Sequence, residues 1–128
     1  LDVNNIFVNS VNHGYDPVEF LKALPGERIA YGHIAGHFNE AEDLIVDTHA
    51  ANVTGDVWNL LDRAYEVFGV FPTLLERDFN IPPVEELLCE VQKIKTIQSK
   101  WGPDDQANDN QTGHNQTEGH ENGRRKSA

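Results

Sequence analysis

The chain has 128 residues, about the size of one small domain, and a formal net charge of −11. This acidic balance excludes the basic stripe that a nucleic-acid-binding surface needs, and no apolar run approaches the roughly 20 residues of a membrane span. The single cysteine excludes an internal disulfide and favours a reducing, cytoplasmic setting. Because the chain lacks methionine and opens inside an apolar pattern, we expect a C-terminal piece of a longer protein.

The first half of the chain predicts three strands and one short helix. Residues 1–8 are typical of a strand, and Asp16-Pro17 begins a helix over residues 18–24. Residues 28–35 form the second predicted strand, and residues 38–42 form a polar loop. Residues 44–46 (LIV) indicate a buried parallel strand, because this apolar run has polar residues at its carboxyl end.

The second half predicts two helices and one strand, followed by a tail. Residues 57–68 carry apolar side chains at helical spacing, and Gly69 stands where a helix ends. Residues 71–75 form the fourth predicted strand, and the last helix runs from residue 84 to about Trp101. The composition then becomes polar, so we expect residues 102–128 to be a disordered polar tail.

This order of elements predicts an α/β fold with about four parallel strands. Right-handed crossovers would place the carboxyl ends of all the strands on one side of the sheet. A complete (β/α)8 TIM barrel takes about 250 residues. The chain is therefore expected to be the C-terminal half of such a barrel, with residues 1–101 forming a partial metal-binding domain.

Each predicted strand ends in side chains that can bind a metal. Residues two apart on a strand point to the same side, as in the pair Asp47 and His49. Oxygen and imidazole ligands without thiolate suit iron, manganese or zinc, and several carboxylates suit more than one ion. The alternative is a polar network that only closes a barrel mouth. The candidate ligands are Asp2, Asn4, His33, Asp47, His49 and Glu76.

Four motifs in this order resemble a known family. The segments LDVNN…VNHG, GHIAGH, IVDTH and PTLLERDFNIPP are similar to the C-terminal half of the multinuclear non-heme iron-dependent oxidative enzymes. That TIM-barrel family includes the methanobactin biosynthesis oxidase. The resemblance implies two or three irons at a barrel mouth and a dioxygen-dependent modification of cysteine or nearby residues in a ribosomal peptide. It also implies a peptide substrate, often presented by a separate partner protein.

The resemblance assigns roles to particular residues. Either Asn4 or Asn5 matches the family's asparagine ligand; alternation along a strand favours Asn4, and a bulge would favour Asn5. His37 and Asp78 match positions that orient ligands or contact the peptide. No residue is assigned a catalytic role. The residues that match the family's metal ligands are Asp2, an asparagine of the Asn4-Asn5 pair, His33, Asp47, His49 and Glu76.

The chain also departs from the family. Residues 50–53 lack an expected proline, and Arg77 replaces a usual aromatic residue, which would alter the substrate preference. The earlier strands that supply further His and Glu ligands are absent from this chain. Two other functions therefore remain open. One is a divalent-metal barrel that isomerises sugars or hydrolyses phosphoesters, as an endonuclease does; the other is a truncated half-barrel that catalyses nothing and at most binds a partner.

Overall fold

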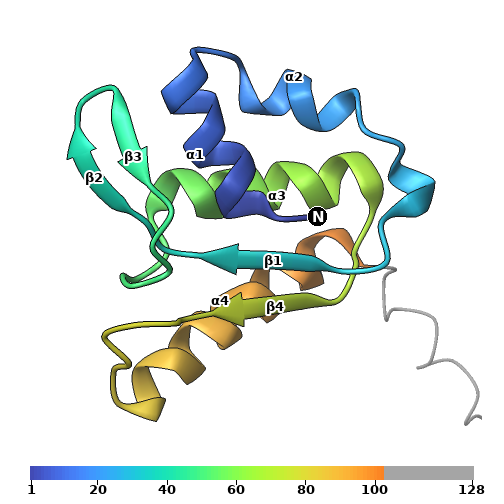
Figure 1. The fold of residues 1–128 in the computed structure, drawn as a ribbon. Coiled ribbons are helices and arrows are strands. Elements are labelled where there is room, and N and C mark those ends of the chain that lie inside the picture. Colours follow the sequence, from blue (N-terminus) through green and yellow to red (C-terminus); the bar gives the residue numbers. More distant parts are fainter. Residues whose placement is uncertain (103–128) are drawn as a thin grey trace, which may run out of the picture.

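The computed structural model describes residues 1–102, which form an α/β arrangement of helices around a short parallel strand pair. Figure 1 shows α1 and α3 on one side of β1, α2 packed beyond them, and α4 behind β4. The elements in chain order are α1 (Val3–His13), α2 (Pro17–Lys22), a 3-10 turn (Gly26–Arg28), β1 (Gly32–Ala35), β2 (Phe38–Ala41), β3 (Leu44–Val46), α3 (Gly55–Phe68), β4 (Thr73–Glu76) and α4 (Val84–Trp101).

The predicted strand over residues 1–8 is wrong, because these residues begin α1. Asp2 is the N-cap of this helix, and its carboxylate accepts a hydrogen bond from the Asn5 amide at 2.8 Å. Gly14 ends the helix in the left-handed conformation, with a φ of 67°. Val3 and Ile6 are buried three residues apart, which is a helical spacing rather than the alternation of a strand.

The predicted strands over residues 28–35 and 71–75 are confirmed in part as β1 and β4, which pair in parallel. In their register His33 lies opposite Leu74, and Ala35 lies opposite Glu76. Because side chains alternate along a strand, all four lie on one face of the pair. Ile34, on the other face, is completely buried. On the free side of β1, the His33 amide donates to the Leu1 carbonyl at 2.8 Å, which adds a single parallel bridge.

Residues 44–46 are not a buried parallel strand. They form β3, which pairs antiparallel with β2, so the predicted polar loop over residues 38–42 is mostly a strand as well. Only Ile45 is buried, whereas Leu44 and Val46 are 46% and 42% exposed. β4 pairs directly with β1, so this β2–β3 hairpin is inserted after β1 instead of lying between the parallel strands. A two-residue turn at residues 42–43 allows this pairing.

The hydrophobic core lies between α1, α2, α3 and β1. Val3, Leu21, Val57 and Leu61 are completely buried within it. The three predicted helices over residues 18–24, 57–68 and 84–101 are confirmed as α2, α3 and α4, and Asp16 caps α2 as expected. Among the residues of α4 only Ile94 is fully buried, so this helix covers the core from one side.

The expected half-barrel is confirmed only as a small α/β unit. Residues 1–102 contain one parallel strand pair and one isolated parallel bridge, and they do not close into a barrel. None of the helices in this part of the chain combines the length and apolar character needed to cross a bilayer. The expected disordered tail lies, apart from Gly102, outside the described residues.

Asp62 joins α3 to the end of α4, which gives a test of how firmly that helix is held. Its carboxylate accepts hydrogen bonds from Lys100 Nζ at 2.8 Å and from Trp101 Nε1 at 2.6 Å. Burial raises the pKa of Asp62, but these hydrogen bonds outweigh burial and lower it below its ordinary value. The ionised carboxylate therefore stabilises the folded chain at neutral pH.

We expect Asp62→Asn to lower the free energy of unfolding at pH 7 by about 1 kcal/mol, measured by urea denaturation. The difference between the two proteins should shrink as the pH falls below about 4, because protonated Asp62 loses the same charge. Glu66→Gln, which removes an exposed partner of Arg63 on the same helix, is the matched control and should have a smaller effect. Equal stability of Asp62→Asn and the unmodified chain at pH 7 would contradict this account.

Candidate metal centre

Three of the predicted ligands meet where α1, β1 and β4 come together. Asp2, His33 and Glu76 each offer one donor atom, and these atoms all lie within 4.8 Å of one another. His33 Nδ1 is 3.0 Å from Glu76 Oε1, and both side chains are partly exposed. They share a face of the strand pair, whereas Asp2 reaches it from the N-terminus of α1. These three side chains can hold one metal ion.

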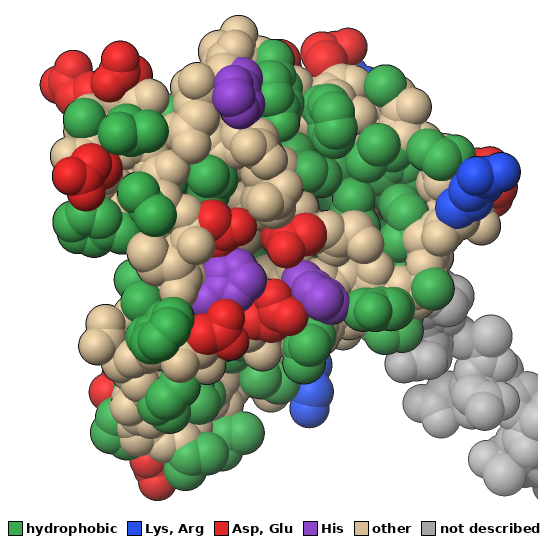
Figure 2. All heavy atoms as spheres, viewed as in Figure 1, with side chains coloured by type: hydrophobic (Ala, Val, Ile, Leu, Met, Phe, Trp, Pro, Cys, Tyr) green, Lys and Arg blue, Asp and Glu red, His purple; other side chains and the backbone are tan. Residues whose placement is uncertain are grey.

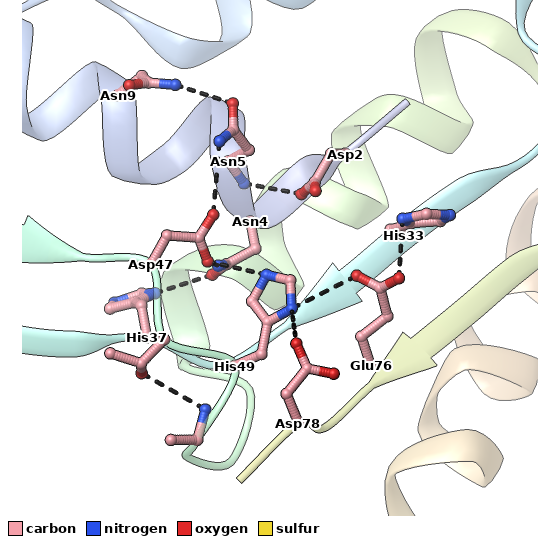
Figure 3. A network of polar contacts seen from close by, with 12 residues as sticks. Asp2, Asn4, Asn5, Asn9, His33, His37, Asp47, His49, Glu76 and Asp78 are labelled. Atoms are coloured by element: carbon pink, nitrogen blue, oxygen red, sulfur yellow. Dashed lines mark hydrogen bonds and ion pairs between the residues drawn. The ribbon is translucent and has the colours of Figure 1, made fainter.

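His49 joins this group to a second set of carboxylates (Figure 3). Its Nε2 lies 2.9 Å from Asp47 Oδ1, and its Nδ1 lies 3.2 Å from Asp78 Oδ2 and 3.6 Å from Glu76 Oε2. Glu76 therefore contacts His33 with one oxygen and His49 with the other. A carboxylate placed between two imidazoles in this way can bridge two neighbouring metal ions.

Asn4 and His37 form the buried side of the same network. Asn4 is completely buried; it donates to Asp47 Oδ1 at 2.6 Å, and its Oδ1 faces His37 Nδ1 at 2.9 Å. His37 is 5% exposed, and its burial lowers the pKa of the imidazole, against the opposing effects of the charges of Asp47 and Asp56. Because the amide oxygen of Asn4 faces His37 and can only accept, His37 donates the hydrogen bond from Nδ1. His37 thus orients Asn4, which in turn orients Asp47.

All nine residues singled out in the sequence lie in this one cluster, although one of the four predicted strands is a helix and another pairs antiparallel in a hairpin. Asn5 also donates to Asp47, at 3.4 Å, and accepts from Asn9 at 2.8 Å. The alternation that favoured Asn4 over Asn5 does not apply, because both lie on a helix. The choice between them as a ligand stays a prediction. Asn9 was not singled out from the sequence. Its spacing of four residues from Asn5 indicates a contact only when residues 3–13 are known to form a helix.

Two loops that carry site residues are joined by backbone contacts. The Asp78 amide donates to the His49 carbonyl at 2.9 Å, and the Asn80 side chain donates to the Ala50 carbonyl at 3.2 Å. His49 and Asn80 both have a positive φ, of 49° and 48°. Residues other than glycine adopt this conformation rarely and at some energetic cost, so the contacts between the loops hold His49 in a strained backbone position.

Arg77 and Glu90 fix these loops to α4. The Arg77 guanidinium donates to Asn52 Oδ1 at 2.5 Å and lies 3.7 Å from Glu90 Oε2. The other oxygen of Glu90 accepts from the Val53 amide at 2.8 Å. Both side chains of the pair are largely buried, at 7% and 15% exposed. The sequence signalled Arg77 only as a departure from the family pattern and did not indicate Glu90 at all.

The cluster opens to solvent on one face of the molecule, where acidic and histidine side chains gather (Figure 2). A concavity of about 550 Å³ lies beside it and is lined by Asp47, His49, Asp78 and the exposed ring of Phe79, among others. The donors are imidazole nitrogens and carboxylate or amide oxygens without thiolate, a set that suits iron, manganese or zinc. Both ring nitrogens of His49 face carboxylates, which is the environment that a bound cation would neutralise.

The chain is similar to a described family and to several curated proteins. The model of the family described as "RiPP precursor modification enzyme MbnB/TglH/ChrH" matches residues 1–99. A UPF0276 protein from Nitrosospira multiformis is 62% identical over 100 residues, covering 78% of this chain and 35% of its own length. UPF0276 proteins from Alcanivorax borkumensis and Shewanella sediminis are 66% and 65% identical, and 34% and 35% of their lengths are covered. The chain thus spans about a third of the length of these relatives.

Removing the Arg77 guanidinium should loosen both loops. We expect Arg77→Ala to lower the free energy of unfolding by about 2–4 kcal/mol, because Glu90 would be left as a largely buried, unpaired carboxylate. Hydrogen exchange at the Asp78 amide, which bonds His49, should become faster in the same variant.

Lys95→Ala, which removes an exposed cation from α4, is the matched control and should change neither quantity measurably. Arg77→Lys should fall between Arg77→Ala and the unmodified chain, because lysine keeps the charge but not the planar fork. Unchanged exchange at Asp78 in Arg77→Ala would show that Arg77 does not hold the loops.

Proposed function

Because the chain belongs to the MbnB/TglH/ChrH family of RiPP precursor modification enzymes, we propose that its polar cluster is part of an iron centre that oxidatively modifies a ribosomally made peptide. The observation that carries this proposal is the position of Glu76, whose two oxygens face His33 and His49. A carboxylate whose two oxygens face two histidines suits a site with more than one metal ion, because carboxylate and imidazole are ligands that iron accepts. We propose two or three irons in the complete site.

The cluster supports a division of ligands between neighbouring ions. One ion would be held by Asp2, His33 and Glu76, whose donor atoms already lie close together. A second would lie on the other side of Glu76, held by Asp47 and His49. Asn4 or Asn5 would lie beside the second ion, because both side chains contact Asp47, and the one that coordinates would do so through its amide oxygen.

The surrounding residues would orient the ligands. Asp78 lies 3.2 Å from His49 Nδ1, so it would help to orient the imidazole ring. His37 and Asn4 hold Asp47 from the buried side. Bound iron would supply the activation of dioxygen, while these residues keep the ligands in place and leave the exposed side open.

The concavity beside His49 would receive the peptide. Its wall includes residues 47–50 and the exposed ring of Phe79, and the ring suits an apolar side chain of a bound peptide. We propose a cysteine-containing peptide, presented with the help of a separate partner protein. The family's description supports a ribosomal peptide as the substrate class, and the finer points rest on the resemblance of the motifs.

The site in this chain would be incomplete by itself. The chain spans about a third of its relatives, and the face of β1 and β4 that carries His33 and Glu76 also carries Leu74, which is 53% exposed. An apolar side chain left uncovered beside metal ligands is expected where further barrel strands would pack. Full iron loading should therefore require the rest of such a barrel.

Metal content tests the proposal. We would express the 128-residue chain anaerobically, alongside a chimera in which residues 1–99 replace the matching third of the Nitrosospira multiformis relative. Elemental analysis should find two or three irons per chimera and fewer in the 128-residue chain. Zinc alone, or no bound metal in the chimera, would contradict an iron oxidase and favour a hydrolase-like or non-catalytic protein.

The role of His49 is tested in the same chimera. His49→Ala should lower both the iron content and the peptide-dependent consumption of dioxygen, because His49 lies between the two groups of carboxylates. His13→Ala, which alters an exposed histidine at the end of α1 outside the cluster, is the matched control and should retain both. Normal iron and full oxidation in His49→Ala would remove His49 from the ligand set.

A further inference from the structure

The two edges of the β2–β3 hairpin differ in how their backbone groups are satisfied. On the β3 edge, the Asn12 side chain accepts from the Ile45 amide and donates to the Ile45 carbonyl, each at 2.8 Å. A side-chain amide in this position replaces the hydrogen bonds of a neighbouring strand. The edge formed by β3 is therefore closed by α1.

The edge formed by β2 is open. Residues along a strand point their amide and carbonyl alternately to opposite edges, and those of Ile45 point to Asn12. Asn39, which lies opposite Ile45, therefore directs its own amide and carbonyl away from β3. Within residues 1–102, no hydrogen bond reaches the backbone from this side, and all four residues of β2 are exposed. An unpaired edge of this kind can accept an added strand.

The hairpin combines acidic side chains at its tip with exposed apolar side chains at its base. The stretch from residue 29 to residue 62 contains no lysine or arginine, and the hairpin itself carries Glu40, Glu42 and Asp43. Phe38 lies opposite Val46 in the register, and these two side chains are 56% and 42% exposed. A partner strand beside β2 would thus meet acidic side chains at the tip and apolar side chains near the base.

The hairpin is also joined to the metal centre at both ends. His37 directly precedes β2, and Asp47 directly follows β3, so the base of the hairpin is part of the cluster. In Figure 1 the hairpin stands at the side toward which β1 and β4 point. A chain bound along β2 would extend from the acidic tip toward the cluster.

We propose that the free edge of β2 binds an extended segment of the peptide substrate as an added antiparallel or parallel strand, and that this segment combines basic and apolar residues. Backbone hydrogen bonds to Asn39 would give affinity, while Glu40, Glu42 and Asp43 would select cationic side chains. This inference rests on the proposed function, since it names the surface by which the peptide reaches the same site.

The test uses a fluorescein-labelled seven-residue peptide of alternating valine and lysine, with binding to the 128-residue chain followed by fluorescence anisotropy. Asn39→Pro removes the outward amide without removing a hydrogen bond between β2 and β3, because that amide points away from β3. We expect this variant to weaken binding at least tenfold. Asn39→Ala keeps the amide and is the matched control, so its affinity should equal that of the unmodified chain.

A second test changes the peptide instead of the protein, so its result does not depend on whether Asn39→Pro folds. The same peptide with methylated backbone nitrogens at alternate positions should bind at least tenfold more weakly, and a valine–glutamate peptide should not bind. Equal binding by Asn39→Pro, or by the methylated peptide, would show attraction by charge alone and overturn the proposal. The proposal would also be overturned if the unmodified chain did not bind the peptide, or if it formed a dimer through β2 that Asn39→Pro dissociates.

The iron content of Asn39→Pro in the chimera separates this proposal from the function it rests on. Asn39 is outside the cluster, so the iron content should be unchanged whether or not the peptide binds at β2. Normal iron together with unaltered probe binding would overturn the docking edge and leave the iron centre standing. Iron absent from the unmodified chimera would instead remove the proposed function itself.

Discussion

The parallel pairing of β1 with β4 is the constraint on which the rest of the structure depends. Two strands separated by almost 40 residues of sequence meet in a register that places His33 and Glu76 on one face. The hydrogen bond from His33 to the Leu1 carbonyl then brings the start of α1, and with it Asp2, to the same place. The opposite face of the pair, with Ile34 at its centre, is covered by helices. One side of the pair thus belongs to the core, and the other side belongs to the site.

The second half of the site depends on contacts between loops instead of strands. His49 has a strained backbone conformation, and the hydrogen bond from the Asp78 amide holds it against the loop after β4. Gly36 permits the close approach of this region to the end of β1, because a Cβ atom there would lie 2.0 Å from the Ala51 carbonyl oxygen. Arg77 and Glu90 then fix the loops to α4. The cost of placing His49 is therefore offset by the folded loops around it.

Much of the candidate site could be predicted from the sequence, even where the predicted elements were wrong. Asp2 was predicted to lie at the end of a strand. It caps α1 instead, yet it still lies beside His33 of β1. Asp47 and His49 were assigned to a parallel strand and follow an antiparallel hairpin, yet both still reach the cluster. Asp47, His49 and Glu76 lie close together because polar residues at the ends of short strands gather at one edge of an α/β unit.

The sequence by itself determined the helices over α2, α3 and α4 and the kinds of donor atom in the cluster, because caps, apolar spacing and ligand chemistry are local properties. Only the tertiary structure decided that β4 pairs with β1, that β2 and β3 form a hairpin, and that Asn12 closes one edge of that hairpin. It also decided that Glu76 faces two histidines and that Arg77 reaches Glu90. The physical reason is that a strand's hydrogen-bonding partner and a side chain's contacts depend on residues far away in sequence, which short apolar segments do not specify.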